Sequence, residues 1–427
     1  MSTTKNQAVA SSSGIAASAI RSWRTPFVII GFGCLISLMS FGPRSSLGFF
    51  LTPMSTDNQW GRDVFAFALA IQNLLWGVGQ PLAGMIADRF GTVRVFCGGA
   101  LMFALGLALM AHASSAPVLD VSAGALVGFG LSGTSFMMIV ATFGKLLPPE
   151  RRMIAFGLGT AAASFGQFVY SPLSVMLIDS FGWQQTLMIF AVSMLGVLPL
   201  SMALAAPKAA ATTTASQSRD AVDQSLWHAL TEAFSQRSYV MLVIGFFTCG
   251  FQLAFITVHL PAYLVDRGLS ATVGGWTLAV IGLFNILGSV TYGWLSNHLP
   301  KRFLLSFNYF VRAAAIFAFI SFPVTPFSAI AFAVVMGFVW LSVVPPTNGI
   351  IAVMFGTRWL GTLAGFAFLS HQIGGFLGAW LGGIVFDRFG SYDPVWWLAI
   401  ALGIFSGLIN MPIVEKPVSR MAAVLPA

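Results

Sequence analysis

The sequence predicts an all-α integral membrane protein with twelve transmembrane helices in two pseudo-symmetric six-helix bundles. Three observations lead to this fold class. First, 57% of the 427 residues are hydrophobic and only 8% are charged, which excludes an ordinary soluble domain. Second, the apolar residues gather in twelve stretches, each close to the roughly 20 residues that a helix needs to cross a bilayer. Third, the two halves of the chain repeat short sequence features at a nearly constant spacing.

The expected spans are 26–51, 64–87, 95–113, 118–146, 153–178, 184–206, 239–264, 272–296, 301–322, 327–351, 360–385 and 394–413. The only long polar connection separates the sixth span from the seventh. We therefore expect a disordered cytoplasmic tail over 1–25, six-helix bundles over 26–206 and 239–413, a cytoplasmic linker over 207–238 between them, and a cytoplasmic tail over 414–427.

The internal repeat relates the two predicted bundles. Gly84-Met-Ile-Ala-Asp88 matches Gly293-Trp-Leu-Ser-Asn297 at an offset of 209, Asp179-Ser-Phe-Gly182 matches Asp387-Arg-Phe-Gly390 at 208, and Pro53 matches Pro261 at 208. A shared offset in three places indicates a duplicated six-helix unit. In duplicated membrane transporters the substrate path lies between the repeats, near the middle of the membrane.

The net charge of +8 is explained by membrane topology rather than by nucleic-acid binding. Most Lys and Arg residues lie in connections that we place in the cytoplasm, whereas Arg62, Arg267 and Arg388 lie on the opposite side. This asymmetry predicts a multi-pass protein of the plasma membrane, the inner membrane if the source is bacterial, with both termini in the cytoplasm.

The loop after span 2 carries a family signature. Gly84-Met-Ile-Ala-Asp88-Arg89-Phe-Gly91-Thr-Val-Arg94 resembles the corresponding loop motif of the major facilitator superfamily. The resemblance implies the major facilitator fold, and it implies that Asp88, Arg89 and Arg94 form a cytoplasmic gate that must break when this side opens. The alternative is that Arg89 and Arg94 only determine the topology.

Shorter pieces resemble the bacterial monocarboxylate and oxalate–formate transporter branch of that superfamily. They are Trp60-Gly-Arg62, Glu150-Arg151-Arg152 followed by Ala155-Phe-Gly157-Leu158, and Asp266-Arg-Gly268-Leu269. That branch often carries a carboxylate-binding arginine in span 8, which is absent between residues 272 and 296 of this chain. The resemblance therefore implies that Arg44, in span 1, takes this role.

Arg44 is the single charge in the apolar run 26–54. Two interpretations are open: its side chain faces a water-filled cavity, or it snorkels to the interface about 30 Å along the helix from Arg24. All thirteen Asp and Glu residues fall in loops or at span ends, so the spans hold no carboxylate to balance Arg44. A bound carboxylate would supply that charge through a bidentate pair, which favours an anionic substrate over a cation.

Uncharged polar residues near span centres are further candidates for substrate binding. They are Gln72 and Asn73 in span 2, Gln167 and Tyr170 in span 5, Gln252 in span 7 and Asn285 in span 8. His259 in span 7 and the His371-Gln372 pair in span 11 can carry a proton as well as bind substrate. Each of these residues can equally form a hydrogen bond between helices. Arg312 lies on a peripheral span by resemblance, which implies a structural role.

We expect a secondary transporter that moves a small organic anion, a monocarboxylate, by alternating access. Proton symport and anion exchange both remain open. The closest alternative is an efflux pump for hydrophobic compounds, because 14% of the residues are aromatic. Cys34, Cys97 and Cys249 have no metal-ligand spacing and no nucleophile–base pair is evident. We therefore expect no enzyme activity, no metal or cofactor and no nucleic-acid partner, and a monomer surrounded by lipid.

Overall fold

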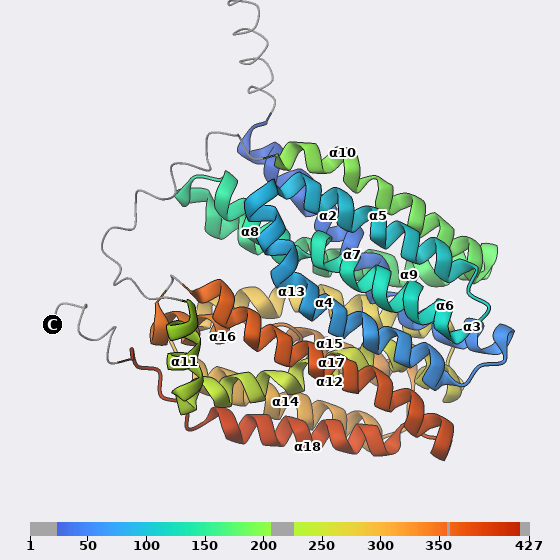
Figure 1. The fold of residues 1–427 in the computed structure, drawn as a ribbon. Coiled ribbons are helices and arrows are strands. Elements are labelled where there is room, and N and C mark those ends of the chain that lie inside the picture. The colour runs from blue at the N-terminus through green and yellow to red at the C-terminus, as the bar shows by residue number, and fades with distance from the viewer. Residues whose placement is uncertain (1–23, 206–225, 357–358, 419–427) are drawn as a thin grey trace, which may run out of the picture.

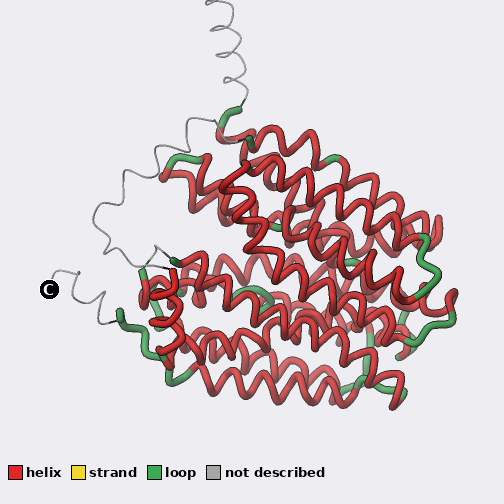
Figure 2. Tube along the Cα trace, in the orientation of Figure 1, coloured by secondary structure: helices red, strands yellow, loops and turns green. Residues whose placement is uncertain are grey.

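A computed structural model describes residues 24–205, 226–356 and 359–418. In these ranges the chain is helical, with short connections and no strand (Figure 2). The helices of the first half and those of the second half form two separate bundles that lie against each other (Figure 1). Of the expected tail over 1–25, residues 1–23 lie outside the described residues. Of the expected linker over 207–238, residues 207–225 lie outside them.

The first bundle contains α2 (Pro26–Ser45), η1 (Leu47–Phe50), α3 (Leu51–Asn58), α4 (Arg62–Phe90), α5 (Thr92–Ala111), α6 (Ala116–Leu119), η2 (Asp120–Leu126), α7 (Val127–Thr134), α8 (Phe136–Leu146), α9 (Pro149–Leu195), α10 (Val197–Ser201) and η3 (Met202–Leu204). The second contains α11 (Leu226–Ser235), α12 (Arg237–Asp266), α13 (Ala271–Leu295), α14 (Lys301–Ser321), α15 (Pro326–Phe338), α16 (Val344–Phe355), α17 (Leu360–Phe389) and α18 (Asp393–Asn410).

Twelve membrane-crossing segments are present, as predicted. By length and composition, nine stretches of the described residues qualify as spans. One of them, Ala155–Leu204, holds two crossings, because α9 turns at Gly182, where φ is 79°. This left-handed conformation suits glycine, which lacks a Cβ atom. The remaining two crossings are α4 and the pair α15 and α16, whose members are too short to qualify singly.

Two expected spans are interrupted near their middles. The expected span 118–146 breaks at Ser135, which is extended with φ −61° and ψ 157° between α7 and α8. The expected span 327–351 breaks over residues 339–343, between α15 and α16. Ser135 and Val343 are 208 positions apart, so the breaks fall at equivalent places in the repeat. A pair of interrupted helices at matching positions is typical of the binding region of transporters.

Buried polar side chains satisfy the backbone groups that the second break leaves free. The Arg312 Nε atom donates to the Val339 carbonyl at 3.1 Å, and its Nη2 atom donates to the Trp340 carbonyl as well. The Asn308 amide also donates to Val339, and the Asn285 Oδ1 atom accepts from the Leu341 N–H at 3.0 Å. Irregular backbone at membrane depth requires such partners, which explains why the helix can break here.

The two bundles meet closely toward one end of the molecule. At η1, a Cβ atom added to Gly48 would lie 2.3 Å from the Thr257 carbonyl oxygen of α12, so only glycine allows this approach. We call this the closed end, and we call the opposite end, where α2 begins and where α11 and α16 lie, the termini end (Figure 1). The cavity described next lies on the termini side of the closed end.

Candidate functional site

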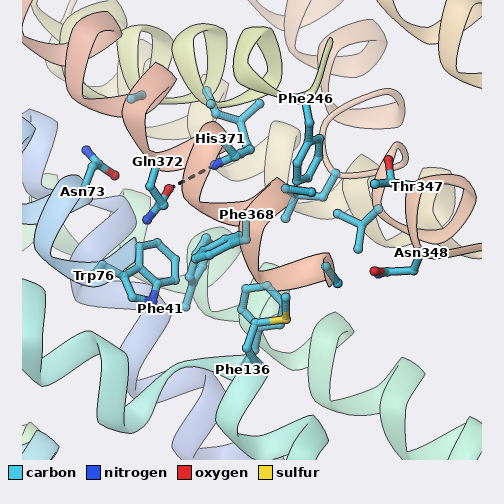
Figure 3. Close-up of a pocket in the computed structure, with 18 of the residues that line it drawn as sticks. Phe41, Asn73, Trp76, Phe136, Phe246, Thr347, Asn348, Phe368, His371 and Gln372 are labelled. Carbon is cyan, nitrogen blue, oxygen red and sulfur yellow. Dashed lines mark hydrogen bonds between the residues drawn. The ribbon is translucent and has the colours of Figure 1, made fainter. Parts of the chain in front are cut away.

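A cavity lies between the bundles and is lined by residues of both (Figure 3). Side chains of α2, α4 and α8 line it from the first bundle, and side chains of α12, α16 and α17 line it from the second. The interrupted spans both contribute to its wall: Phe136 and Met137 follow the first break, and Leu341 and Val344 flank the end of the second. The breaks therefore shape this cavity.

Arg44 lies near the end of α2 and lines the cavity. Its Nη2 atom donates to the Asn73 Oδ1 atom at 2.7 Å, and its Nε atom is buried without a hydrogen-bond partner among the described residues. The guanidinium carbon lies 5.8 Å from the ring centroid of Phe41 and 5.4 Å from that of Trp76. In the described part of the chain no carboxylate forms an ion pair with Arg44. Of the two interpretations made from the sequence, this position agrees with a side chain that faces a cavity and not with one that snorkels to the membrane interface.

His371 and Gln372 of α17 lie across the cavity from α2. The His371 Nδ1 atom lies 3.0 Å from the Gln372 Oε1 atom, which can only accept, so Nδ1 carries the hydrogen and Nε2 keeps a lone pair (Figure 3). His371 is 8% exposed, and its Nε2 atom and the Gln372 Nε2 atom have no partner among the described residues. The cavity thus combines a cation, a free acceptor and a free donor.

Five aromatic rings line the cavity together with smaller aliphatic side chains: Phe41, Trp76, Phe136, Phe246 and Phe368. The Trp76 and Phe368 rings meet edge to face across the bundles at 5.5 Å. Toward the termini end the wall becomes polar again at Thr347 and Asn348 of α16, and the Thr347 hydroxyl is buried without a described partner.

Five residues predicted to bind substrate lie outside this cavity and join helices instead. Gln72 donates to the Ala123 carbonyl, Gln167 to Leu278, Gln252 to Ala399 and Asn285 to the Ser164 hydroxyl, while the Tyr170 ring packs on Phe190. The contacts of Gln167 and Asn285 cross between the bundles. In these five residues the side chain contacts a neighbouring helix through a hydrogen bond or, for Tyr170, through ring packing. Contact between helices is the alternative that the sequence left open.

His259 is also outside the cavity, within the closed end. Its Nε2 atom lies 2.7 Å from the Ala379 carbonyl, and its Nδ1 atom lies 3.3 Å from the Tyr392 hydroxyl. A carbonyl only accepts, so Nε2 carries the hydrogen and Nδ1 accepts from Tyr392. Burial raises the pKa of Tyr392 to about 12, so its hydroxyl keeps the donating proton at neutral pH. Both nitrogens of a neutral His259 are therefore satisfied.

Charged groups from both bundles join at the closed end. The Arg62 guanidinium of α4 binds both carboxylate oxygens of Asp266, at 2.6 and 2.7 Å, and donates to the Tyr392 hydroxyl at 2.9 Å. Asp387 of α17 accepts the backbone N–H groups of Arg62 and Asp63, at 3.1 and 2.8 Å. It therefore caps the N-terminus of α4 from the other bundle, where a negative charge is favourable.

The predicted gate residues of the span 2 loop are only partly described. The side chains of Asp88 and Arg89 lie outside the described residues. Arg94 is exposed and its Nη1 atom donates to the Phe90 carbonyl at 3.0 Å. The gate therefore remains a prediction.

Several cavity residues escaped the choice of candidates from the sequence. Trp76 follows Asn73 by three positions, and Phe368 precedes His371 and Gln372 by three and four, the spacing that places side chains on one helix face. A search for aromatic residues three or four positions from the polar residues Asn73, His371 and Gln372 would have found Trp76 and Phe368. No comparable signal marks Phe246 or Phe136.

Comparisons with known proteins agree with this architecture. The family model described as Major Facilitator Superfamily matches residues 33–379. The uncharacterized MFS-type transporter YcxA of Bacillus subtilis is 26% identical over 91% of this chain and 95% of its own length. Monocarboxylate transporter 13 of Rattus norvegicus is 25% identical, covering 83% of this chain and 81% of its own length, and monocarboxylate transporter 11 of Homo sapiens is 24% identical over 89% and 81%.

Solved structures share the fold at lower identity. The D-xylose-proton symporter aligns with a TM-score of 0.74 at 15% identity, over 93% of this chain and 99% of that one. A bacterial homologue of the human lysosomal transporter Spinster aligns with a TM-score of 0.66 at 14% identity, over 90% and 93%. At such identity the likeness concerns the fold alone.

Proposed function

The chain belongs to the major facilitator superfamily of membrane transporters, which are not enzymes, and from this premise we propose that it moves a small monocarboxylate by alternating access. The observation that carries the proposal is Arg44, a cation that lines the cavity with no acidic partner among the described residues. A guanidinium at bilayer depth is costly without a counter-ion, and a carboxylate supplies one with matching two-pronged geometry. Two relatives named as monocarboxylate transporters support the same substrate class.

The substrate-binding group of the proposal is smaller than the set chosen from the sequence. Arg44 binds the carboxylate, with Asn73 orienting the guanidinium. His371 and Gln372 complete the site, because both residues line the same cavity and each keeps a buried nitrogen atom without a partner among the described residues. We assign a role in helix packing to the others: Gln72, Gln167, Tyr170, Gln252 and Asn285.

The conformation fits one state of the transport cycle. With both termini in the cytoplasm, as the distribution of Lys and Arg favours, the closed end is the extracellular gate of a plasma-membrane protein. The cavity is then an inward-facing site. Opening the Arg62–Asp266 pair and closing the termini end would turn the same site outward, and a substrate that binds the intermediate more tightly speeds this exchange.

If transport is coupled to protons, His371 is the carrier that the geometry favours. The residue lines the cavity and its Nε2 atom has no partner among the described residues, so it can hold a proton beside a bound carboxylate and release it on the inward side. His259 is less suited. A second proton on its ring would turn Nδ1 into a donor aimed at the Tyr392 oxygen, which already accepts from the Arg62 cation.

The alternative, efflux of hydrophobic compounds, draws support from the aromatic wall. A neutral apolar compound would, however, leave Arg44 without a counter-ion when the cavity closes around it. We therefore retain the carboxylate as the substrate.

Uptake into proteoliposomes tests the proposal. Wild-type protein should accumulate radiolabelled monocarboxylates, and the Arg44→Ala variant should not. Gln72→Asn is a matched control, since this amide lies outside the cavity, and it should transport normally. Unchanged carboxylate uptake by Arg44→Ala would refute the role of Arg44. Export of dyes by the wild type, with no acid uptake, would favour the efflux alternative.

A further inference from the structure

The wall around Arg44 is aromatic on both sides of the cavity. Phe41, Trp76 and Phe136 come from the first bundle, whereas Phe246 and Phe368 come from the second. Figure 3 shows these rings around one shared space. Because the rings belong to both bundles, a solute in the cavity contacts aromatic surface whichever bundle it touches.

The geometry at Arg44 directs a bound acid toward these rings. Asn73 occupies the Nη2 atom, and the guanidinium lies over the rings of Phe41 and Trp76. A carboxylate can then bind the guanidinium N–H groups that Asn73 leaves free, beside these two rings. The Trp76 ring contacts the Phe368 ring of the other bundle, at a centroid distance of 5.5 Å. The organic part of the acid therefore lies between aromatic faces and edges.

We infer that the preferred substrate is an aromatic monocarboxylate rather than a short aliphatic acid such as lactate or pyruvate. The inference rests on the proposed function, because it assumes that Arg44 binds a carboxylate. An aromatic ring gains edge-to-face and offset contacts with Phe and Trp beyond its burial of apolar area. An acid of two or three carbons reaches few of these rings and gains little from them.

Thr347 offers a second polar group in the same cavity. Its hydroxyl is buried without a partner among the described residues, and both Thr347 and Arg44 line the cavity. The five aromatic rings line it with them, so the organic part of an acid bound at Arg44 lies among these rings.

Equilibrium binding to the purified full-length protein in nanodiscs, measured by calorimetry, tests the inference. The probes are benzoate and phenylacetate, the aliphatic acids acetate, L-lactate and pyruvate, and the uncharged benzamide and phenylacetamide. Phe246→Leu and Phe368→Leu remove one ring each from the wall. Phe332→Leu is the matched control, since this ring stacks on Phe319 at 4.3 Å within the second bundle and does not line the cavity.

We expect the aromatic acids to bind at least about tenfold more tightly than the aliphatic acids, and the amides to bind at least about tenfold more weakly than the matching acids. Phe246→Leu and Phe368→Leu should weaken the aromatic acids by about two- to twelvefold while leaving lactate unchanged, which also shows that the variants fold. Phe332→Leu should leave all affinities unchanged.

Two results would overturn the inference while the proposed function stands. One is lactate or pyruvate binding as tightly as benzoate and phenylacetate. The other is an equal loss for aromatic and aliphatic acids in the two cavity variants. A different result, amides that bind as tightly as acids or no binding of any acid, would overturn the proposed function itself.

Discussion

Arg62 at the start of α4 and Asp266 at the end of α12 join the two bundles by a two-pronged ion pair. The Arg62 guanidinium also lies 3.9 Å from the ring centroid of Phe386. Its side chain is only 15% exposed and that of Asp266 31% exposed, so water screens the pair less than it would a free surface pair. The Asp387 cap on α4 adds a second link between the bundles.

Removing this ion pair should open the closed end. We expect Arg62→Gln or Asp266→Asn to shift the conformational equilibrium toward the state open at this end by about 1–2 kcal/mol, or five- to thirtyfold. Spin labels at Thr56 and Ser270, introduced after replacing the three cysteines, report the distance between the bundles.

Two further variants make the test specific. The exchange Arg62→Asp with Asp266→Arg should restore part of the closed population. Arg267→Gln should have little effect, because its pair with Asp393 is longer, at 3.6 Å, half exposed and confined to the second bundle. Equal opening by Arg267→Gln would mean that general surface charge, not the Arg62 pair, controls this end.

Asn73→Asp should weaken the binding of acids without removing Arg44. The substitution nearly preserves side-chain shape, and it places a carboxylate 2.7 Å from the Arg44 guanidinium. This internal carboxylate supplies the charge that a substrate would bring, so we expect affinity for acids to fall by about 10- to 150-fold, as for a lost charged hydrogen bond. Calorimetry with the variant measures this loss.

Thermal unfolding distinguishes neutralisation of Arg44 from damage to the fold. Asn73→Asp should unfold at the same temperature as the wild type or higher, because the buried cation gains a partner. Full acid affinity in this variant would contradict the role of Arg44 as the counter-ion of the substrate.

The two histidines should separate in transport assays. His371→Gln should lose accumulation driven by a pH gradient while keeping exchange of labelled for unlabelled acid, because exchange needs no proton carrier. His259→Gln should keep gradient-driven accumulation but weaken the closed end, since the amide cannot match both contacts to Ala379 and Tyr392. Normal accumulation by His371→Gln would remove this residue from the coupling mechanism.

The fold was predictable because its determinants are local or repeated. Twelve apolar stretches, one long polar linker and a 208–209-residue repeat suffice for two six-helix bundles. The breaks after Thr134 and Phe338 were not predictable in the same way. Hydropathy is insensitive to a few residues of irregular backbone, and the partners that stabilise the second break, Asn285 and Arg312, are distant in sequence.

Of the candidate site, only the charged residue Arg44 could be chosen from the sequence with a clear physical reason. Arg44 stood out because a lone cation in an apolar run needs an explanation, and its position in the cavity supplies one. Gln72 and Asn73 are adjacent and chemically alike, yet one faces Ala123 and the other faces Arg44. Successive residues differ by about 100° around a helix, so only the packing of neighbouring helices decides which amide reaches the cavity.

Arg312→Met should destabilise the second bundle although it removes a buried charge. The guanidinium is fully buried and donates to the carbonyls of Val339 and Trp340 where the tenth span breaks, and its Nη1 atom lies 3.4 Å from the Gln252 Oε1 atom. Methionine fills a similar volume but donates no hydrogen bond. The Val339 carbonyl keeps its bond from Asn308, whereas the Trp340 carbonyl loses its donor, at a cost of about 1–3 kcal/mol. The midpoint of thermal unfolding in detergent should fall clearly, whereas Arg267→Met, at an exposed site, should leave it nearly unchanged. An unchanged midpoint for Arg312→Met would mean that the break holds without these bonds, and that Arg312, the second cation within the spans, has another role.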